Sequence, residues 1–450
     1  MAVTENKTTK PEEPLVPDEA QTASAEGDLR GLIKRGMASF EIDTRMFGML
    51  IGLVVIWIGF HFWTGGTFLT PRNLWFLSLQ TAIVAIMATG MVLVIVSRNI
   101  DLSVGSMLGF IGMFMALLQA EWLPSVMGFD NPNTWMIVLA AGLVLGAILG
   151  LIQGAVVAYA GVPSFIVTLG GLLVWRGLSW VMASGRTIAP MDSTFQLLGG
   201  GARGTAGGTI SWIIGGVAAV AIVLLLLSRR RNRIKFGFRV RPLWADITLM
   251  ILGPALVLGT VWFLNQYYMP DAVAQQYAEA NGLEIPPEGL EIPFGLANPV
   301  LIALGTALVM TFVATRRRFG RYVYSIGGNP EAAQLSGIKT KRIIMLTFMV
   351  MGILVGLAAA VQIARLNSAT AGLGTLQELS VIAAAVIGGT SLSGGVGTVF
   401  GAVLGALFMQ SLQSGMVLVG IQTATQDVVV GVVLVAAVAV DVAYRRRQAR

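Results

Sequence analysis

The feature that most constrains this chain is a series of apolar stretches of about 20 residues, several of which contain no charged side chain. A helix of that length crosses the roughly 30 Å hydrocarbon core of a bilayer. Buried strands of water-soluble α/β proteins are apolar over only about 4–8 residues, which is too short to explain these stretches. Charged residues make up 12% of the chain, against about 25% in soluble domains. The sequence therefore predicts a protein that spans a lipid bilayer.

The apolar stretches divide into twelve spans, whose boundaries are defined to within a few residues. The predicted spans are 46–63, 74–96, 102–119, 135–159, 165–183, 209–228, 245–268, 297–314, 343–363, 378–389, 396–420 and 427–443. The stretch 378–389 is too short to cross a bilayer alone, so we expect a half-helix buried among other helices. The predicted fold class is an all-α polytopic membrane protein of about twelve transmembrane helices, including one or more broken or half helices.

Lysine and arginine residues are concentrated in three clusters, and such clusters mark the cytoplasmic side of a membrane protein. The clusters are Arg229–Arg231 with Arg233 and Lys235, Arg316–Arg318 with Arg321, and Arg445–Arg447. Residues 242–315 contain no basic residue, and their polar loop, 269–296, is acidic. Counting spans from a cytoplasmic N-terminus places all three clusters and the C-terminus in the cytoplasm and the acidic loop outside.

Several classes of chemistry are excluded by composition. The chain has no cysteine and a single histidine, His61, which removes disulfides, thiolate nucleophiles and Cys/His zinc sites. We expect no catalytic residue and no metal site. The net charge of +7 lies mainly in the basic clusters, so it indicates membrane orientation and not nucleic-acid binding. None of the six lysines follows a glycine, so the phosphate-binding motif of ATPases is absent.

Glycine-rich runs within the spans predict close helix packing. Residues 142–150 and 397–405 each place a glycine at every fourth position. In a bilayer, helices associate largely through close approach over small residues of this kind. We therefore expect both runs to lie at helix–helix contacts.

A short polar segment, 329–337, lies in the basic loop 315–342 between two apolar spans. Asn329 is suited to capping a helix and Pro330 to its first position. Glu331 places negative charge at the positive end of the helix dipole, and Gly337 can end the helix in a left-handed conformation. Local physics predicts a helix of about two turns. It leaves open whether that helix is a solvated connector or a docking element for a partner.

This segment resembles the loop with which permeases of ABC importers dock on their ATPase subunit. The shared pattern is Glu331-Ala332-Ala333 followed by Gly337, and 327–338 as a whole is similar to the branch that imports ribose, xylose and related sugars. Two further stretches, 99–106 and 378–397, resemble the signatures of that branch. The resemblance implies an ATPase-coupling loop formed by Asn329, Pro330, Glu331, Ala332, Ala333, Ser336 and Gly337.

The resemblance also implies how the chain is divided. Ribose-type permeases have about ten spans, whereas this chain carries two more spans and the acidic loop at 201–290, as the longer D-xylose permeases do. We expect a cytoplasmic tail that is largely disordered, an N-terminal core half, a two-helix insertion, a C-terminal core half that includes the loop 315–342, and a basic cytoplasmic tail. Their ranges are 1–45, 46–200, 201–290, 291–443 and 444–450.

The partners that the resemblance implies are a cytoplasmic ATPase subunit, a periplasmic sugar-binding protein and a second copy of the permease. The expected function is transport of a monosaccharide, D-xylose, across a bacterial inner membrane by alternating access. No cofactor is expected in this chain, because the ATPase subunit would bind the ATP.

Candidates for the sugar path or its gate begin with polar residues in the first core half. Arg176 lies deep in a span, where a charge is costly and faces the protein interior. It either lines the path or anchors structure through a carboxylate. Asp101, with Ser103 beside it, is placed to cap the third span, and we favour that structural role over a role in the path.

The remaining candidates lie in the second core half. Ser391 and Ser393 fall in a glycine-rich break, where freed backbone groups can meet a polar solute. Arg365 and Glu378 flank a predicted outer loop. These two residues either pair with each other or contact the binding protein.

The main alternative function is an ion-coupled secondary transporter of a small polar solute. Such a transporter needs ion or proton sites near the midplane of the bilayer. Six spans carry no charged residue, namely 74–96, 135–159, 209–228, 297–314, 343–363 and 396–420. This weakens the alternative, although carbonyl oxygens alone can bind sodium. A channel or scaffold is a third possibility, but nothing in the chain resembles a selectivity filter.

Overall fold

The computed structural model describes residues 44–128, 130–201, 204–281 and 291–448. Ten of its helices are long and apolar enough to cross a membrane, and two shorter apolar helices begin at Gln377 and Thr423. These twelve helices correspond to the twelve predicted spans, so the all-α polytopic class is confirmed. The predicted tail, 1–45, lies almost entirely outside the described residues.

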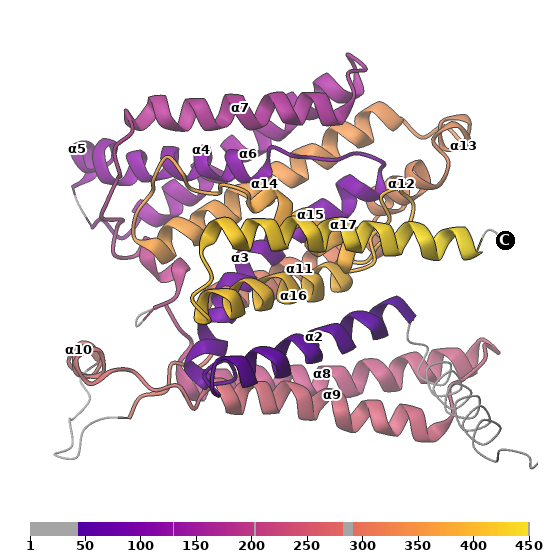
Figure 1. Ribbon diagram of the computed structural model, residues 1–450, viewed down its shortest axis with the longest axis horizontal. Helices are drawn as coiled ribbons and strands as arrows, with labels where there is room; N and C mark the ends of the chain where they lie inside the picture. Colours follow the sequence, from indigo (N-terminus) through magenta and orange to yellow (C-terminus); the bar gives the residue numbers. More distant parts are fainter. Residues whose placement is uncertain (1–43, 129, 202–203, 282–290, 449–450) are drawn as a thin grey trace, which may run out of the picture.

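The helices follow one another with short connections, as the ribbon in Figure 1 shows. In chain order they are α2 (Thr44–Trp63), α3 (Pro71–Val96), α4 (Val104–Leu117), a π-helical turn (Leu118–Trp122), α5 (Pro124–Met127), α6 (Thr134–Ala158), α7 (Ser164–Ala183), a 3₁₀ turn (Phe195–Gly199), α8 (Gly207–Lys235), α9 (Leu243–Leu264), α10 (Asp271–Asn281), α11 (Asn298–Arg316), α12 (Arg318–Gly328), α13 (Pro330–Leu335), α14 (Thr340–Leu366), α15 (Gln377–Ile387), α16 (Val399–Leu418) and α17 (Thr423–Gln448).

The structure differs from the sequence-based expectation at several boundaries. The loop after α11 contains a second helix, α12, which carries its apolar side chains on one face and is too polar elsewhere to resemble a span. Helix α8 continues beyond its apolar part through Lys235, and α17 remains helical through Gln448. The predicted spans stop at the first charged residues, because the prediction followed apolarity. The helices continue beyond those residues, since lysine and arginine are good helix formers.

The core is built around α3 and α14. Most of α3 is buried, and it packs against α11, α14, α15 and α16. Helix α14 packs along α6 and also contacts α4. The N-terminal and C-terminal halves therefore interlock, because α6 lies against α14 of the other half and α16 lies against α3.

Both glycine runs lie at close helix contacts, as predicted. A methyl group at Gly146 would overlap the carbonyl oxygen of Gly352, so α6 and α14 approach backbone to backbone. In the second run, a methyl group at Gly405 would overlap the carbonyl oxygen of Ala384, at the contact of α16 with α15. Small residues thus set the distance between the central helices.

Helices α8 and α9 form a hairpin at the side of the core. They pack against each other, and α9 touches α3. An ion pair between Arg230 and Asp246 joins their ends. At the opposite end of the hairpin, Trp75 of α3 donates from Nε1 to the carbonyl oxygen of Gly295 at 2.9 Å, which ties the following loop to the core.

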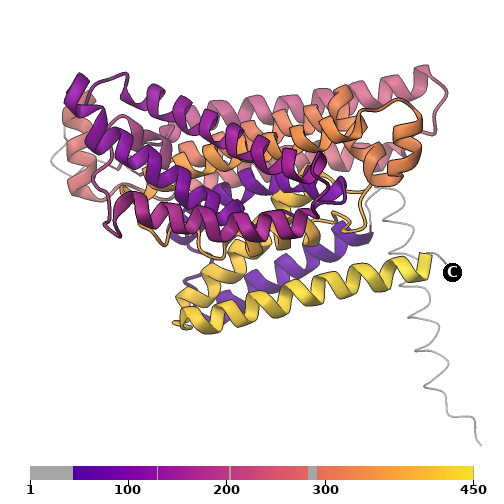
Figure 2. The same cartoon turned by 90° about the horizontal axis from the view of Figure 1, so that it is seen from above.

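The helices run roughly side by side, so the molecule has two ends. In Figure 1, α13, the turn between α8 and α9 and the C-terminal end of α17 lie at one end, and α5 and α10 lie at the other. Figure 2, turned by 90°, shows the C-terminal end of α17 at the same end of the bundle. All three basic clusters therefore share one end, which agrees with the single orientation inferred from charge.

Candidate functional site

Helix α13 is the capped helix that the sequence predicts. Asn329 Oδ1 accepts a hydrogen bond from the backbone N–H of Ala332 at 3.0 Å, and Pro330 is the first helical residue. Ser336 Oγ donates to the carbonyl oxygen of Ala332 at 2.8 Å. Gly337 has a φ of 82°, the left-handed conformation expected at the end of this helix.

The outer surface of α13 is well suited to contact another molecule. Ala333 is buried against the core, whereas Glu331 and Leu335 face away. Leu335 is 90% exposed, although it lies at an end of the molecule among polar residues and not on the lipid-facing side. A single exposed leucine is common on protein surfaces, so the exposure of α13 leaves this surface accessible to a partner without identifying one.

Beneath α13, three chain segments meet in what we call the inner junction, defined as 96–98, 324–328 and 394–397. A methyl group at Gly327 would overlap the carbonyl oxygen of Val96, so the end of α12 lies directly on the end of α3. Gly395 N–H donates to that same carbonyl oxygen at 3.0 Å. The end of α12, which leads into α13, is thus fixed to α3 and to the loop between α15 and α16.

Two side chains lock this junction. Arg98 has a φ of 64° and donates from Nε to the carbonyl oxygen of Gly327 and from Nη2 to that of Gly328, both at 2.8 Å. Tyr324 donates from its hydroxyl to the carbonyl oxygen of Gly397 at 2.7 Å. Burial raises the pKa of Tyr324. The carbonyls at the end of α12 therefore find partners in a guanidinium group.

The junction brings together the three stretches on which the family resemblance rests. The first follows Arg98, the second is 327–338 and the third includes Gly394 and Gly395. Sequence reasoning missed Arg98 and Tyr324. The available signal for Arg98 was an arginine placed directly after a long uncharged span and directly before a motif.

Asp101 and Ser103 lie in the break between α3 and α4, and both are buried. Asp101 Oδ1 accepts from the N–H of Ser103 at 2.9 Å and from its hydroxyl, and Ser103 also bonds Gln153 of α6. Burial raises the pKa of Asp101, and the hydrogen bonds from Ser103 lower it. The expected cap is not formed as predicted, because Asp101 bonds Ser103 before the helix starts and no side chain caps α4.

Arg176 and Glu378 are also interior groups. Arg176 Nη2 and Glu378 Oε2 are buried and have no hydrogen-bond partner within the described residues. Glu378 lies directly against Gly105, so closely that a side chain at position 105 would overlap the Glu378 carboxylate. In the described part of the chain, no ion pair joins Glu378 to Arg176 or to Arg365, so the first of the two alternatives, pairing of Arg365 with Glu378, is not seen, and contact with the binding protein stays a prediction.

The two serines of the second break lie beside each other. Ser391 Oγ and Ser393 Oγ are 3.1 Å apart. They precede Gly394, which reaches the inner junction, so they lie near the coupling segment. Asp101, Ser103, Glu378 and Ser391 are all buried. Asp101 and Ser391 each lie three residues from a residue of the inner junction, Arg98 and Gly394 respectively.

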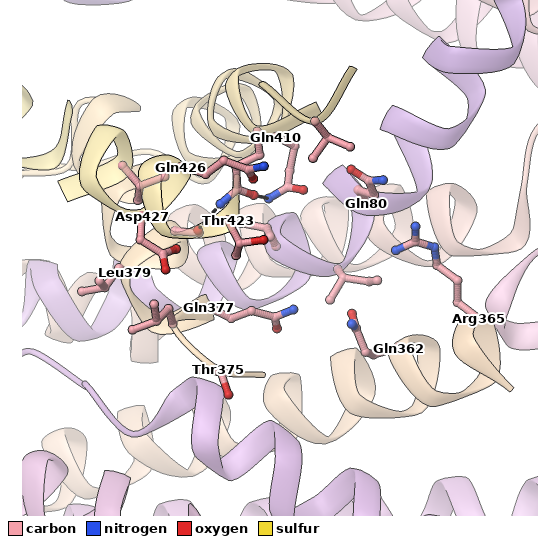
Figure 3. A pocket seen from close by; sticks show the side chains of 17 residues that line it. Gln80, Gln362, Arg365, Thr375, Gln377, Leu379, Gln410, Thr423, Gln426 and Asp427 are labelled. Atoms are coloured by element: carbon pink, nitrogen blue, oxygen red, sulfur yellow. Dashed lines mark hydrogen bonds between the residues drawn. The ribbon is translucent and has the colours of Figure 1, made fainter. Parts of the chain in front are cut away.

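A cavity of about 330 Å³ opens between α3, α14, α15, α16 and α17. We call it the carboxamide cavity, because six glutamine side chains line it. They are Gln80, Gln362, Gln377, Gln410, Gln413 and Gln426. Figure 3 shows how the labelled side chains surround Thr423. Arg365 is the single predicted path residue among those that line the cavity.

Two of these carboxamides are held in place by other side chains. Gln410 Nε2 donates to Gln413 Oε1 at 2.7 Å, and Gln413 Nε2 reaches Ser380 Oγ at 3.1 Å. Gln377 Oε1 is buried without a partner among the described residues. Sequence reasoning missed the glutamines because it searched the spans for charge. The available signal was an uncharged amide repeated in otherwise apolar helices, with Gln410 and Gln413 one helical turn apart.

Comparison with known proteins places the chain among permeases. The family described as the permease component of the branched-chain amino acid transport system matches residues 73–438. The xylose transport system permease protein XylH of Haemophilus influenzae is 37% identical over 407 residues, which cover 90% of this chain and 98% of that protein. The ribose import permease protein RbsC of Escherichia coli is 31% identical, over 83% of this chain and 87% of that protein. No solved structure matches the chain.

Proposed function

The chain belongs to the family of permease components typified by the branched-chain amino acid transport system, and we propose that it is the membrane permease of an ATP-driven, binding-protein-dependent importer of D-xylose. It is a transport subunit and not a catalytic enzyme. The choice of sugar follows from the similarity to xylose permeases, which extends over 90% of the chain. The ribose and D-allose permeases among its relatives support a monosaccharide more generally.

The observation that carries this proposal is the inner junction with the exposed helix α13 above it. An importer driven by a separate ATPase needs a rigid handle that is exposed to that ATPase and firmly attached to the transmembrane helices. Helix α13 exposes Leu335 and Glu331, and Arg98 fixes its base to the end of α3. The other end of α3 and the carboxamide cavity lie at a distance from α13, which fits a device that couples one end of the bundle to the other.

The remaining assignments follow from this architecture. The end that carries α13 and the basic clusters would face the cytoplasm, where an ATPase subunit would bind and hydrolyse ATP. The opposite end, with α10, would face the periplasm and receive a sugar-binding protein. A homodimer would give two copies of α13 for two ATPase subunits. ATP binding would bring the two α13 helices together and switch the side of the membrane to which the sugar path opens.

Reconstitution tests the proposed driving force. Proteoliposomes that contain the permease, its ATPase subunit and a xylose-loaded binding protein should accumulate labelled xylose only with ATP, and ionophores that collapse proton and sodium gradients should leave uptake unchanged. Uptake by the permease alone under an ion gradient would favour a secondary transporter instead.

The coupling role of α13 predicts a specific defect. Gly337→Asp should reduce xylose uptake at least about tenfold, because it adds negative charge at the exposed C-terminal end of α13, while membrane insertion is retained. Gly337→Asn is the matched control, since asparagine tolerates the left-handed conformation without the charge. Glu331→Lys, compared with Glu331→Gln, tests the same surface by charge reversal. Normal ATP-dependent uptake in both Gly337→Asp and Glu331→Lys would contradict docking through α13.

A further inference from the structure

We propose that the carboxamide cavity is a sugar-binding site within the permease itself, specific for uncharged polyhydroxylated solutes of monosaccharide size. This inference rests on the proposed function and deepens it, because it locates the point at which the solute is held during transport. The site differs from most of the predicted path residues, of which Arg365 alone lines the cavity.

The position of the cavity suits a solute received from outside. Its lining comes from the first half of α3, the last turn of α14, the first turns of α15 and α17 and the second half of α16. These segments lie in the half of the molecule opposite α13. Buried Ile83, Val84 and Val430 form apolar parts of the wall. The volume of about 330 Å³ is at the small end of the range for ligand pockets, which begins at roughly 300 Å³.

The hydrogen-bonding groups of the cavity match those of sugar hydroxyls. A carboxamide offers two N–H donors and a carbonyl acceptor, and a hydroxyl both donates and accepts. Gln377 Oε1 is a buried acceptor without a partner in the described part of the chain. A buried polar atom in that state is unfavourable, so it calls for a donor from a ligand or from water. A sugar hydroxyl would supply that donor.

The charge distribution favours a neutral ligand. Among the lining residues, the charged side chains are Arg365 and Asp427, and no ion pair joins them within the described residues. Figure 3 shows these two residues on opposite sides of the cavity, with the glutamines and Thr423 between them. An anion or cation would therefore meet one charge of its own sign, whereas an uncharged polyol meets none and can accept from Arg365 or donate to Asp427.

The cavity is also connected to the coupling machinery through α15. Gln377 is the first residue of that half-helix, and the next residue, Glu378, lies against Gly105 in the first turn of α4. Arg98, which bonds α12, lies in the break between α3 and α4. A movement of α13 can therefore reach the wall of the cavity through two packed contacts, which is what release of a bound sugar would require.

The experiment uses the complete transporter, with ATPase and binding protein, in proteoliposomes and measures xylose uptake and ATP hydrolysis in the same sample. Gln377→Met and Gln362→Met remove a carboxamide with little change in side-chain volume. Gln362 makes no side-chain hydrogen bond within the described residues, so its replacement disturbs no internal contact. Gln422→Met is the matched control, because Gln422 is exposed in the connection between α16 and α17 and does not line the cavity.

We expect both cavity variants to transport at least tenfold less xylose per ATP hydrolysed, while the ATPase rate stimulated by the binding protein stays within twofold of the unmodified transporter and Gln422→Met resembles it in both measures. Uptake per ATP within twofold for the cavity variants would overturn the site. If Gln377→Met is not recovered in the membrane, Gln362→Met decides. Absence of ATP-dependent xylose uptake by the unmodified transporter would overturn the proposed function itself, before any variant is compared.

A photoreactive xylose analogue bearing a diazirine provides an independent measurement. Illumination of the loaded transporter should label peptides of α15 to α17, and a large excess of xylose should abolish that labelling. Labelling confined to other helices, or labelling in this region that excess xylose leaves unchanged, would overturn the site.

Discussion

The inner junction and the carboxamide cavity lie in opposite halves of the molecule and treat polar groups in opposite ways. At the junction, the carbonyl oxygens of Val96, Gly327 and Gly328 accept hydrogen bonds from within the chain. In the cavity, Gln377 Oε1 is buried without a partner among the described residues. The junction satisfies these backbone acceptors by contacts of its own, whereas the cavity combines bonded glutamines, such as Gln410 and Gln413, with a buried acceptor that has no partner among the described residues.

This difference separates two tasks of a transporter. A segment that transmits force must be rigid. At the junction, backbone atoms of different segments touch directly and leave no space for a Cβ at Gly327. A segment that holds a solute must release it, so it presents side chains whose interactions can be exchanged for those of water. Substitutions should therefore affect stability strongly at the junction and transport selectively in the cavity.

The largest effect is expected from Gly327→Ala. The added methyl group would overlap backbone atoms of Val96 and Gly395. Backbone atoms cannot move aside as the end of a flexible side chain can. Overpacking costs about 1–3 kcal/mol and sometimes more, and we expect the upper part of that range because the obstruction is backbone. Thermal unfolding of the purified permease checks this. Gly328→Ala is the control, since nothing lies within 4 Å of its added methyl group; equal stability of the two variants would break the comparison.

A smaller effect is expected from Arg98→Ala. The substitution removes two hydrogen bonds from a charged donor to the end of α12, of which the bond to Gly327 is part-buried and the bond to Gly328 is exposed. A bond to a charged group contributes about 1.5–3 kcal/mol, and we expect the exposed one to add little because water replaces it. We expect a loss of roughly 2 kcal/mol in unfolding free energy and about a tenfold drop in xylose transported per ATP. Arg98→Lys can restore one bond and should recover part of the coupling. Unchanged transport per ATP in Arg98→Ala would show that Arg98 only supports the fold.

The smallest effect on stability is expected from Gln362→Met. Its side chain makes no hydrogen bond in the described part of the molecule and lies at the cavity wall, so the unfolding free energy should change by less than about 0.5 kcal/mol. Differential scanning fluorimetry against the unmodified permease measures this. A loss comparable to that of Arg98→Ala would mean that the cavity is as rigidly built as the junction.

Much of the fold could be predicted because the bilayer imposes length and apolarity on every span. The short stretch at 378–389 was recognised as a half-helix for the same reason, and α15 has 11 residues. The cap of α13 was predictable from Asn329 and Pro330, since capping depends on neighbouring residues alone. Helix α12 was not predicted, because an amphipathic segment of this length with basic residues has no clear signal within a polar loop.

The functional residues were harder to predict because they depend on contacts between distant segments. Arg98 acts on carbonyl groups more than 200 positions away along the chain, and no local pattern reveals that. The glutamines come from four helices and one half-helix, and each by itself looks like an ordinary polar residue in a span. Charge drew attention to the half-buried Arg176 and the buried Glu378, neither of which forms an ion pair within the described residues.

Helix α17 offers a practical consequence for following the transport cycle. Its 26 residues span about 39 Å at 1.5 Å per residue, so the helix projects beyond a 30 Å hydrocarbon core towards the end that carries α13. Since the chain contains no cysteine, one cysteine near Gln448 and one in α13 would be the only thiols of each permease copy to which spin labels could be attached. The distance between the labels, measured with and without ATP in the complete transporter, would report the movement of α13 relative to α17. No native cysteine of the permease would have to be replaced first.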